Sequence, residues 1–173
     1  GVRKGRCRVN LHTCVETLGR WVGRGFGPAG GALDDSGVVS DRAVLRAFFA
    51  NPKNTFLVSF PRTGSHWLRM VMELYFERPS LTRVFYFPEK TDYLTYHTHD
   101  LDLDVVRTHV LYLYREPVDT VYSQLCYHGE DCEDAARVRY WSDLYGRHLD
   151  KWLHRENFTR AKTVLRYEAL KAD

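Results

Sequence analysis

Residues 55–70 read TFLVSFPRTGSHWLRM and pass from a strand pattern to a helix pattern through a short loop. Thr55–Phe60 is a run of β-branched and aromatic residues, which predicts a buried strand that stops at Pro61. Apolar residues then recur at helical spacing as far as Phe76, which predicts a helix that ends before Pro79. Because backbone amides at the start of such a helix can bind an anion, we expect an anion site in this loop.

A second unit of the same kind follows along the chain. Val110–Tyr114 predicts a strand, and Pro117 stands where the first turn of a helix accepts proline. This helix is expected from Val118 to about His128, with the Asp119 carboxylate near the positive end of its dipole. Lys162–Tyr167 predicts a further strand. Strands that alternate with helices predict an α/β fold with three layers, α/β/α, a central parallel sheet and a P-loop-like strand-loop-helix nucleotide site.

Three further segments show weaker patterns. Ser40 or Asp41 is a candidate cap for a short helix through Phe49. Ala135–Glu156 carries the longest helical pattern, and we expect its Trp and Tyr residues in the core. Leu81–Asp104 has no clean period, so we expect a long loop with short elements, of the kind that often holds substrate.

Length and composition fit one compact domain, because 173 residues with 44% hydrophobic content can build a single core. Within it, residues 1–50 form a partly irregular N-terminal segment with no assigned role, and residues 51–173 form the expected nucleotide-binding domain. The net charge of +3 is too small for a nucleic-acid-binding protein, and no apolar run is long enough to span a bilayer. We therefore expect a cytoplasmic protein with a small phosphorylated partner.

The chain has four cysteines, Cys7, Cys14, Cys126 and Cys132. Their number and irregular spacing argue against a zinc site or a disulfide framework, so we expect free thiols. The spacing of Cys126 and Cys132 across a polar turn would permit a bridge in an oxidising compartment.

The loop after the first strand does not have the residues of a Walker phosphate loop. That motif, GxxxxGK[ST], would need a glycine, a lysine and a hydroxyl where this chain has Ser59, Ser65 and His66. The loop instead combines the cation Arg62 with hydroxyls around the single Gly64. This combination suits a phosphosulfate bound without a metal ion.

The same loop resembles the 5′-phosphosulfate-binding loop of the sulfotransferase family, usually written PKSGTTW, with Pro61, Gly64 and Trp67 identical. Members of this family use 3′-phosphoadenosine 5′-phosphosulfate (PAPS) and release 3′-phosphoadenosine 5′-phosphate (PAP). The resemblance implies that Arg62 replaces the family lysine at the phosphosulfate bridge and that Trp67 stacks on adenine. It implies these cofactor-binding residues in the loop: Arg62, Thr63, Gly64, Ser65, His66 and Trp67. His66 in place of a threonine departs from the family pattern.

The second junction carries a second resemblance. Residues 115–123 read REPVDTVYS and resemble the family segment that binds the 3′-phosphate, in which an arginine, a proline, an aspartate and a serine recur at these spacings. The resemblance assigns Arg115 and Ser123 to the 3′-phosphate and makes Asp119 a structural residue of the first helical turn. Without it, Arg115 is read as a surface ion pair and Ser123 as a helix-surface hydroxyl.

Sulfuryl transfer requires a base, and histidine has a suitable pKa near neutral pH. Residues 96–100, YHTHD, resemble the family segment Lys-Thr-His-Leu that carries the catalytic histidine. The register implies His99 as the catalytic base, with His97 as the second candidate and Arg62 as the stabiliser of the leaving group. A metal cluster of His97, His99 and Asp100 is the alternative by ligand type, but the chemistry requires no metal. His109 and His128 are expected to be structural, and His148 to be a core imidazole.

The sequence therefore predicts a PAPS-dependent sulfotransferase that acts on a hydroxyl or amine of a small-molecule, glycan or lipid acceptor, with its oligomeric state left open. Tyr167-Glu168-Ala169-Leu170 resembles the family's Tyr-Glu-Asp-Leu and serves as a fold marker. The late Arg-Lys-Gly and Gly-x-x-Gly-x-Trp segments of the family have no counterpart before Asp173. We therefore expect a chain that is truncated or degenerate, or one that a partner completes. The alternatives are a P-loop-type small-molecule kinase and a nucleotide-binding module with impaired catalysis.

Overall fold

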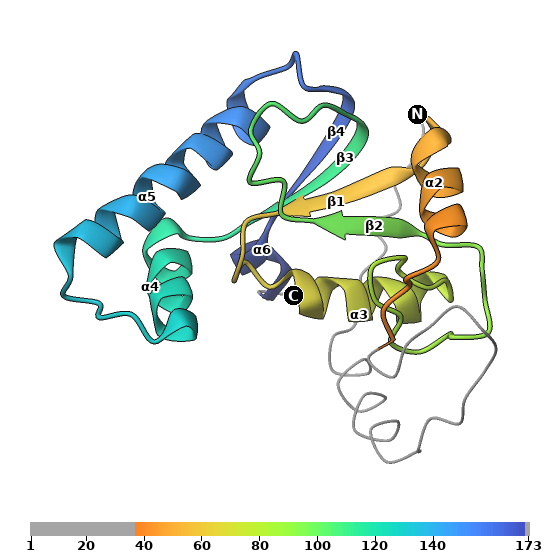
Figure 1. Ribbon diagram of the computed structural model, residues 1–173, viewed down its shortest axis with the longest axis horizontal. Coiled ribbons are helices and arrows are strands. Elements are labelled where there is room, and N and C mark those ends of the chain that lie inside the picture. The colour runs from red at the N-terminus through yellow and green to blue at the C-terminus, as the bar shows by residue number, and fades with distance from the viewer. Residues whose placement is uncertain (1–36, 172–173) are drawn as a thin grey trace, which may run out of the picture.

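A computed structural model of the chain describes residues 37–171. Four strands form one parallel sheet in the order β2-β1-β3-β4 (Figure 1). Their bounds are β1 Thr55–Ser59, β2 Thr95–Thr98, β3 Arg107–Tyr114 and β4 Thr159–Arg166. Helices lie on both faces of the sheet, so the predicted α/β fold with a central parallel sheet is confirmed. Because parallel strands end at the same edge, the loops after β1, β2 and β3 meet there.

The helices are α2 Arg42–Ala50, α3 Ser65–Phe76, α4 Pro117–His128, α5 Ala135–Leu149 and α6 Tyr167–Lys171. The Asp41 side chain accepts a hydrogen bond from the Ala43 amide at 2.7 Å, so Asp41 caps α2, one of the two candidates for that role. Pro117 occupies the first turn of α4, as expected, and Gly129 ends this helix with φ of 65°.

The alternation of side chains along the strands divides the core between the two faces of the sheet. On one face, Phe56 and Tyr112 pack with Trp152 and with Phe48 of α2. On the other face, a second cluster joins the sheet to α3 and α6, and it includes Leu57, Leu68, Leu113, Trp67 and Tyr167. Both faces of β1 are therefore covered, which explains its continuous apolar run.

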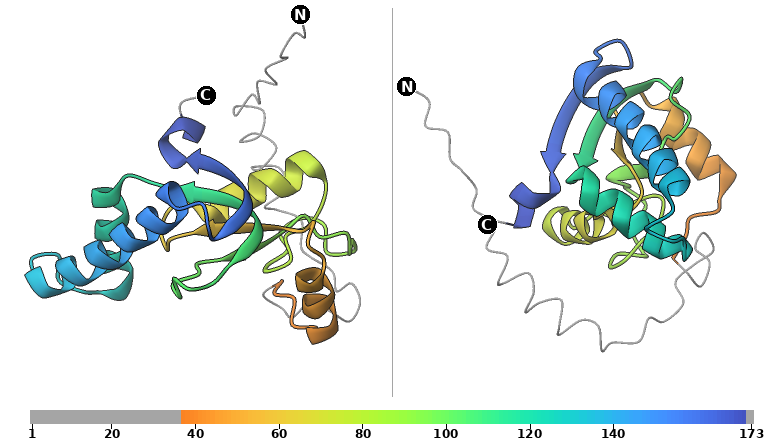
Figure 2. Two further views of the ribbon diagram at one scale, coloured as in Figure 1. Left: turned by 90° about the horizontal axis from the view of Figure 1, so that it is seen from above. Right: turned by 90° about the vertical axis from the view of Figure 1, so that its left-hand side faces the viewer.

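A third cluster joins α4 to α5 beyond the carboxyl end of β1 (Figure 2). It contains Phe60, Val121, Leu125 and Tyr145. The Tyr145 hydroxyl donates to the Arg115 carbonyl at 2.7 Å and accepts from the Arg115 amide at 3.1 Å. The α4–α5 pair thus fixes the backbone where β3 ends, at the start of the second predicted motif.

One expectation on secondary structure needs correction. The segment 81–104 is a long loop with short elements, as expected, and one of these elements is the edge strand β2. The helix expected over 135–156 is an α-helix only to Leu149 and continues as the π-helical turn η1, Asp150–His154. This turn buries Trp152 completely and lets the Lys151 ammonium donate to the Val105 carbonyl at 2.5 Å.

Cys126 and Cys132 are free thiols, as expected, while Cys7 and Cys14 lie outside the described residues. Within residues 37–171, no helix has both the length and the apolar character to cross a membrane.

Candidate functional site

The β1–α3 loop has the backbone of an anion-binding turn. Gly64 has φ of 90° and Arg62 has φ of 68°, so two residues of this short loop adopt the left-handed conformation. The buried Thr63 hydroxyl donates to the Phe60 carbonyl at 2.8 Å and holds the turn. The N-terminus of α3 has no side-chain cap, which leaves its first amides to a ligand or to water.

Tyr167 lies against this loop. A Cβ atom on Gly64 would stand 2.5 Å from the Tyr167 ring, so the close approach requires glycine. The same ring meets Trp67 edge to face at 6.3 Å and lies 5.1 Å from the Arg115 guanidinium carbon. The sequence indicates Tyr167 only as a fold marker, although its place at the end of a predicted parallel strand is a signal for a site residue.

Arg62 and Ser123, one from each predicted motif, lie side by side. Arg62 Nε donates to Ser123 Oγ at 3.3 Å, and the Arg62 guanidinium lies 4.8 Å from the Tyr127 ring centre. Arg115 Nη1 donates to the Arg62 carbonyl at 3.4 Å. The two strand-to-helix junctions therefore present both arginines and a serine hydroxyl at one site.

Arg115 also forms an ion pair with Asp119, with 3.2 Å between Nη2 and Oδ2. This is the surface ion pair that the sequence left as an alternative reading. The buried Nε of Arg115 has no hydrogen-bond partner among the described residues, so one directional donor remains unused. A phosphate oxygen at this nitrogen would use that donor, which fits a phosphate site.

His99 is held by the end of β1. Its Nδ1 lies 2.8 Å from the Ser59 carbonyl oxygen, which can only accept a hydrogen bond. The proton is therefore on Nδ1, and Nε2 has the free lone pair that a base needs. Burial lowers the pKa of His99, and Arg69 adds to this effect against the hydrogen bond to Ser59. His99 is thus neutral at neutral pH.

His97, the second candidate base, is more deeply placed. It is 8% exposed, its Nε2 lies 3.0 Å from Ser59 Oγ, and its ring meets the His99 ring edge to face. Burial, with smaller effects of Arg69 and His99, lowers the pKa of His97 to about 2. Of the two imidazoles, His99 is the less buried and is the better placed to meet an acceptor.

His148 supports the backbone of His99. Its Nε2 donates to the His99 carbonyl at 2.9 Å, and its Nδ1 lies 2.9 Å from the Tyr112 hydroxyl. His148 is completely buried, in agreement with the expected core imidazole, and burial lowers its pKa to about 4. The sequence did not connect His148 with the candidate base, because the contact joins residues far apart in the chain.

The remaining loop residues point in different directions. His66 contacts Arg69 and the Phe85 ring, whereas Arg62 contacts Ser123. Trp67 packs with Leu57 in the cluster under α3. Among residues 37–171, no group of three histidine, cysteine or carboxylate side chains could hold a metal ion, so the alternative cluster with Asp100 is not assembled there. Asp100 instead pairs with Arg107 at 2.6 Å.

A cavity of about 270 Å³ lies away from these residues. It is lined by Thr55 and Thr95, the first residues of their strands, and by Met72 and Phe76 near the end of α3. Both sequence motifs and His99 lie at the opposite, carboxyl edge of the sheet, where open parallel sheets usually bind their ligands.

No family model and no curated protein matches the chain. Among solved structures, it is similar to the mouse sulfotransferase SULT7A1 complexed with PAP, with 19% sequence identity and a TM-score of 0.47. The alignment covers 78% of this chain and 59% of the mouse protein, so the chain spans less than two thirds of that structure.

Proposed function

We propose that the chain is a sulfotransferase that moves the sulfuryl group of PAPS to a hydroxyl or amine of an acceptor. The observation that supports this most is the direct contact between the two motifs, in which Arg62 binds Ser123 and Arg115 binds the Arg62 carbonyl. Arg62 and the uncapped α3 amides would hold the 5′-phosphosulfate, and Arg115 with Ser123 the 3′-phosphate.

The chain's residues suit an in-line displacement. His99 Nε2 would take the proton of the acceptor as its oxygen or nitrogen bonds to sulfur. The breaking bond joins sulfur to the 5′-phosphate oxygen, and Arg62 with the loop amides would stabilise the charge left on that oxygen. When bound, PAPS supplies the sulfuryl group and leaves as PAP. The planar guanidinium of Arg62 can bind two oxygens but cannot readily donate a proton.

Isothermal titration calorimetry with the full chain tests this proposal against its alternatives. We expect PAP to bind without a metal ion and ATP with Mg²⁺ to bind weakly, because residues 59, 65 and 66 lack the Walker groups. Transfer of labelled sulfate from PAPS to a panel of phenols, glycans and amines then separates an active enzyme from a module that only binds. Preference for ATP–Mg²⁺ over PAP would identify a kinase and refute the proposal.

A further inference from the structure

Arg69 carries a buried guanidinium whose hydrogen-bond donors are mostly unused. The residue lies one turn into α3 and is 5% exposed. Its Nη2 lies 3.4 Å from His66 Nδ1, whereas Nε and Nη1 have no partner among residues 37–171. Because burying unpaired donors of a cation is costly, such a group is rarely left without a ligand.

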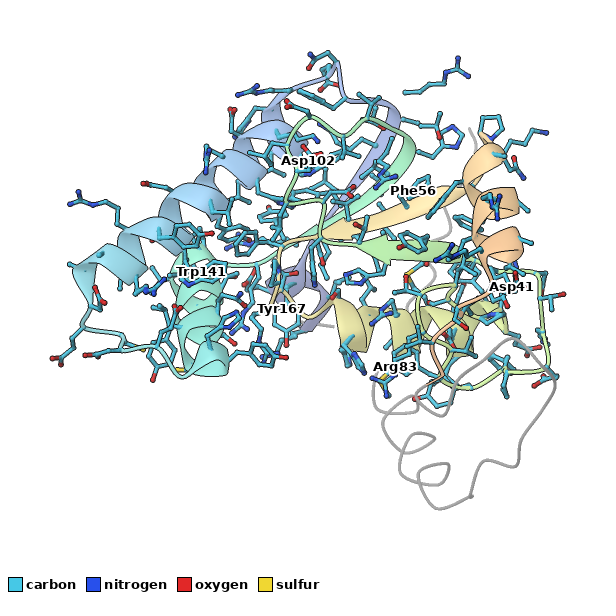
Figure 3. The ribbon with its side chains drawn as sticks, viewed as in Figure 1. Asp41, Phe56, Arg83, Asp102, Trp141 and Tyr167 are labelled. Carbon is cyan, nitrogen blue, oxygen red and sulfur yellow. The ribbon has the colours of Figure 1, made fainter. Side chains whose placement is uncertain are left out.

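A second arginine, Arg83, lies near Arg69. The Arg69 and Arg83 guanidinium carbons lie 5.2 Å and 5.6 Å from the centre of the same Phe85 ring, with Arg83 beside α3 (Figure 3). Burial is the main cause of the lowered pKa values of His66 and His97, and Arg69 lowers both further. Its positive field therefore reaches His66 in the first turn of α3 and His97 in β2.

Glu73 does not use the free donors of Arg69. Its buried carboxylate accepts hydrogen bonds from the amides of Ser80, Phe85 and Tyr86 at 2.8, 2.9 and 3.1 Å. None of the ion pairs formed within the described part of the chain includes Arg69. Glu73 thus balances the charge of Arg69 from one turn away but leaves its directional donors open.

We propose that Arg69, with His66, binds an oxyanion of the acceptor, so that the substrate is a molecule whose reacting hydroxyl or amine stands near a carboxylate, sulfate or phosphate group. The planar fork of an arginine matches two oxygens of such a group. Phe85 covers the guanidinium, so binding requires its ring to turn aside. The anion site itself does not depend on the proposed function. Only the identification of its ligand as the acceptor rests on that function.

Calorimetry on the full chain saturated with PAP tests this site separately from the phosphate loop. The probes are inorganic sulfate, methyl glucuronide, which carries a carboxylate, and methyl glucoside, its neutral match. We expect at least one of the two anions to bind and the glucoside not to bind. The comparison of sulfate with glucuronide shows which oxyanion the site accepts. Failure of both anions to bind overturns the proposal.

Variants identify the residue responsible. Arg69→Lys keeps the charge but removes the fork, and we expect it to weaken anion binding about tenfold or more. Arg139→Lys, on the exposed surface of α5, is the matched control. Equal anion affinity in Arg69→Lys and in the parent chain contradicts the assignment. If Arg69→Lys does not fold, the NMR titration of His66 in the parent chain decides. Sulfate should raise the pKa of His66, and an unchanged pKa refutes the site.

A failure of PAP to bind has a different meaning. It refutes the proposed function and leaves the Arg69 site to be tested alone. The sulfate titration is then made on Arg62→Ala, in which the phosphate loop has lost its cation. Saturable binding to this variant supports the Arg69 site, and no binding overturns it.

Discussion

Replacing His148 by phenylalanine tests how firmly the candidate base is held. The change removes a buried imidazole and leaves both the Tyr112 hydroxyl and the His99 carbonyl without a partner. Each buried group left unpaired costs about 1–3 kcal/mol, so we expect the free energy of unfolding to fall by about 2–6 kcal/mol at pH 7.5. Tyr112→Phe is the matched control, because it removes one of the two hydrogen bonds and should cost about half as much.

This cost should depend on pH in a predictable direction. Burial lowers the pKa of His148 from 6.5 to about 4 in the folded chain, so between these values the unfolded chain binds more protons. The parent chain therefore has the full stabilisation from a neutral His148 above pH 6.5 and loses it as the pH falls toward 4. The loss is about 3 kcal/mol, and His148→Phe does not undergo it. The stability difference between the two chains should narrow by about that amount.

Urea unfolding followed by circular dichroism at several pH values measures both effects. His97 and His99 also titrate as the chain is acidified, but they are present in both chains, so the difference between the chains isolates His148. A stability difference that stays constant from pH 7.5 to pH 4 would show that His148 is not held neutral.

Three further changes test the site directly. His99→Ala should lower the transfer rate about 10²–10⁴-fold and leave PAP affinity nearly unchanged. The control His109→Ala, at the other end of the sheet, should change neither the rate nor the affinity. Intact turnover in His99→Ala contradicts the role of His99 as the base. Arg115→Lys should weaken PAP binding about tenfold in calorimetry, because the ammonium cannot reproduce the fork, and unchanged affinity removes Arg115 from the phosphate site. Gly64→Ala should lower the free energy of unfolding, measured with urea, by about 1–2 kcal/mol for the left-handed backbone alone, and further because the new Cβ meets the Tyr167 ring. Adding Tyr167→Ala to this variant should remove only the loss that comes from the clash with the ring.

The elements that the sequence predicted well have a local signal. Thr55–Phe60 was expected as a strand and β1 covers Thr55–Ser59, because continuous burial on both faces gives a continuous apolar run. The start of α4 was predicted from Pro117, which by itself restricts the backbone. In both cases the information is contained in a few neighbouring residues.

The elements whose place or form the sequence did not define depend on distant partners. The strand β2 has only four residues, with Thr95 and His97 buried, and shows no apolar alternation because polar side chains fill its inner positions. Its pairing with β1 defines it, and no local pattern encodes that pairing. The π-helical turn after Leu149 likewise follows from the burial of Trp152 and the bond of Lys151 to the Val105 carbonyl.

Ser59 explains why the candidate site could be predicted in its residues but not in its connections. The carbonyl of Ser59 sets the tautomer of His99, and its hydroxyl contacts His97, so one residue at the end of β1 fixes both imidazoles. A carboxylate that accepted the Nδ1 hydrogen bond would raise the pKa of His99 strongly. The neutral Ser59 carbonyl raises this pKa less, so it does not cancel the effect of burial. Burial thus keeps His99 unprotonated at neutral pH, while Arg69 lowers and Asp100 raises its pKa by smaller effects. If His99 is the base that we propose, it suits an acceptor that brings its own negative charge, since an oxyanion beside the reacting group would raise the pKa of His99 when it takes a proton.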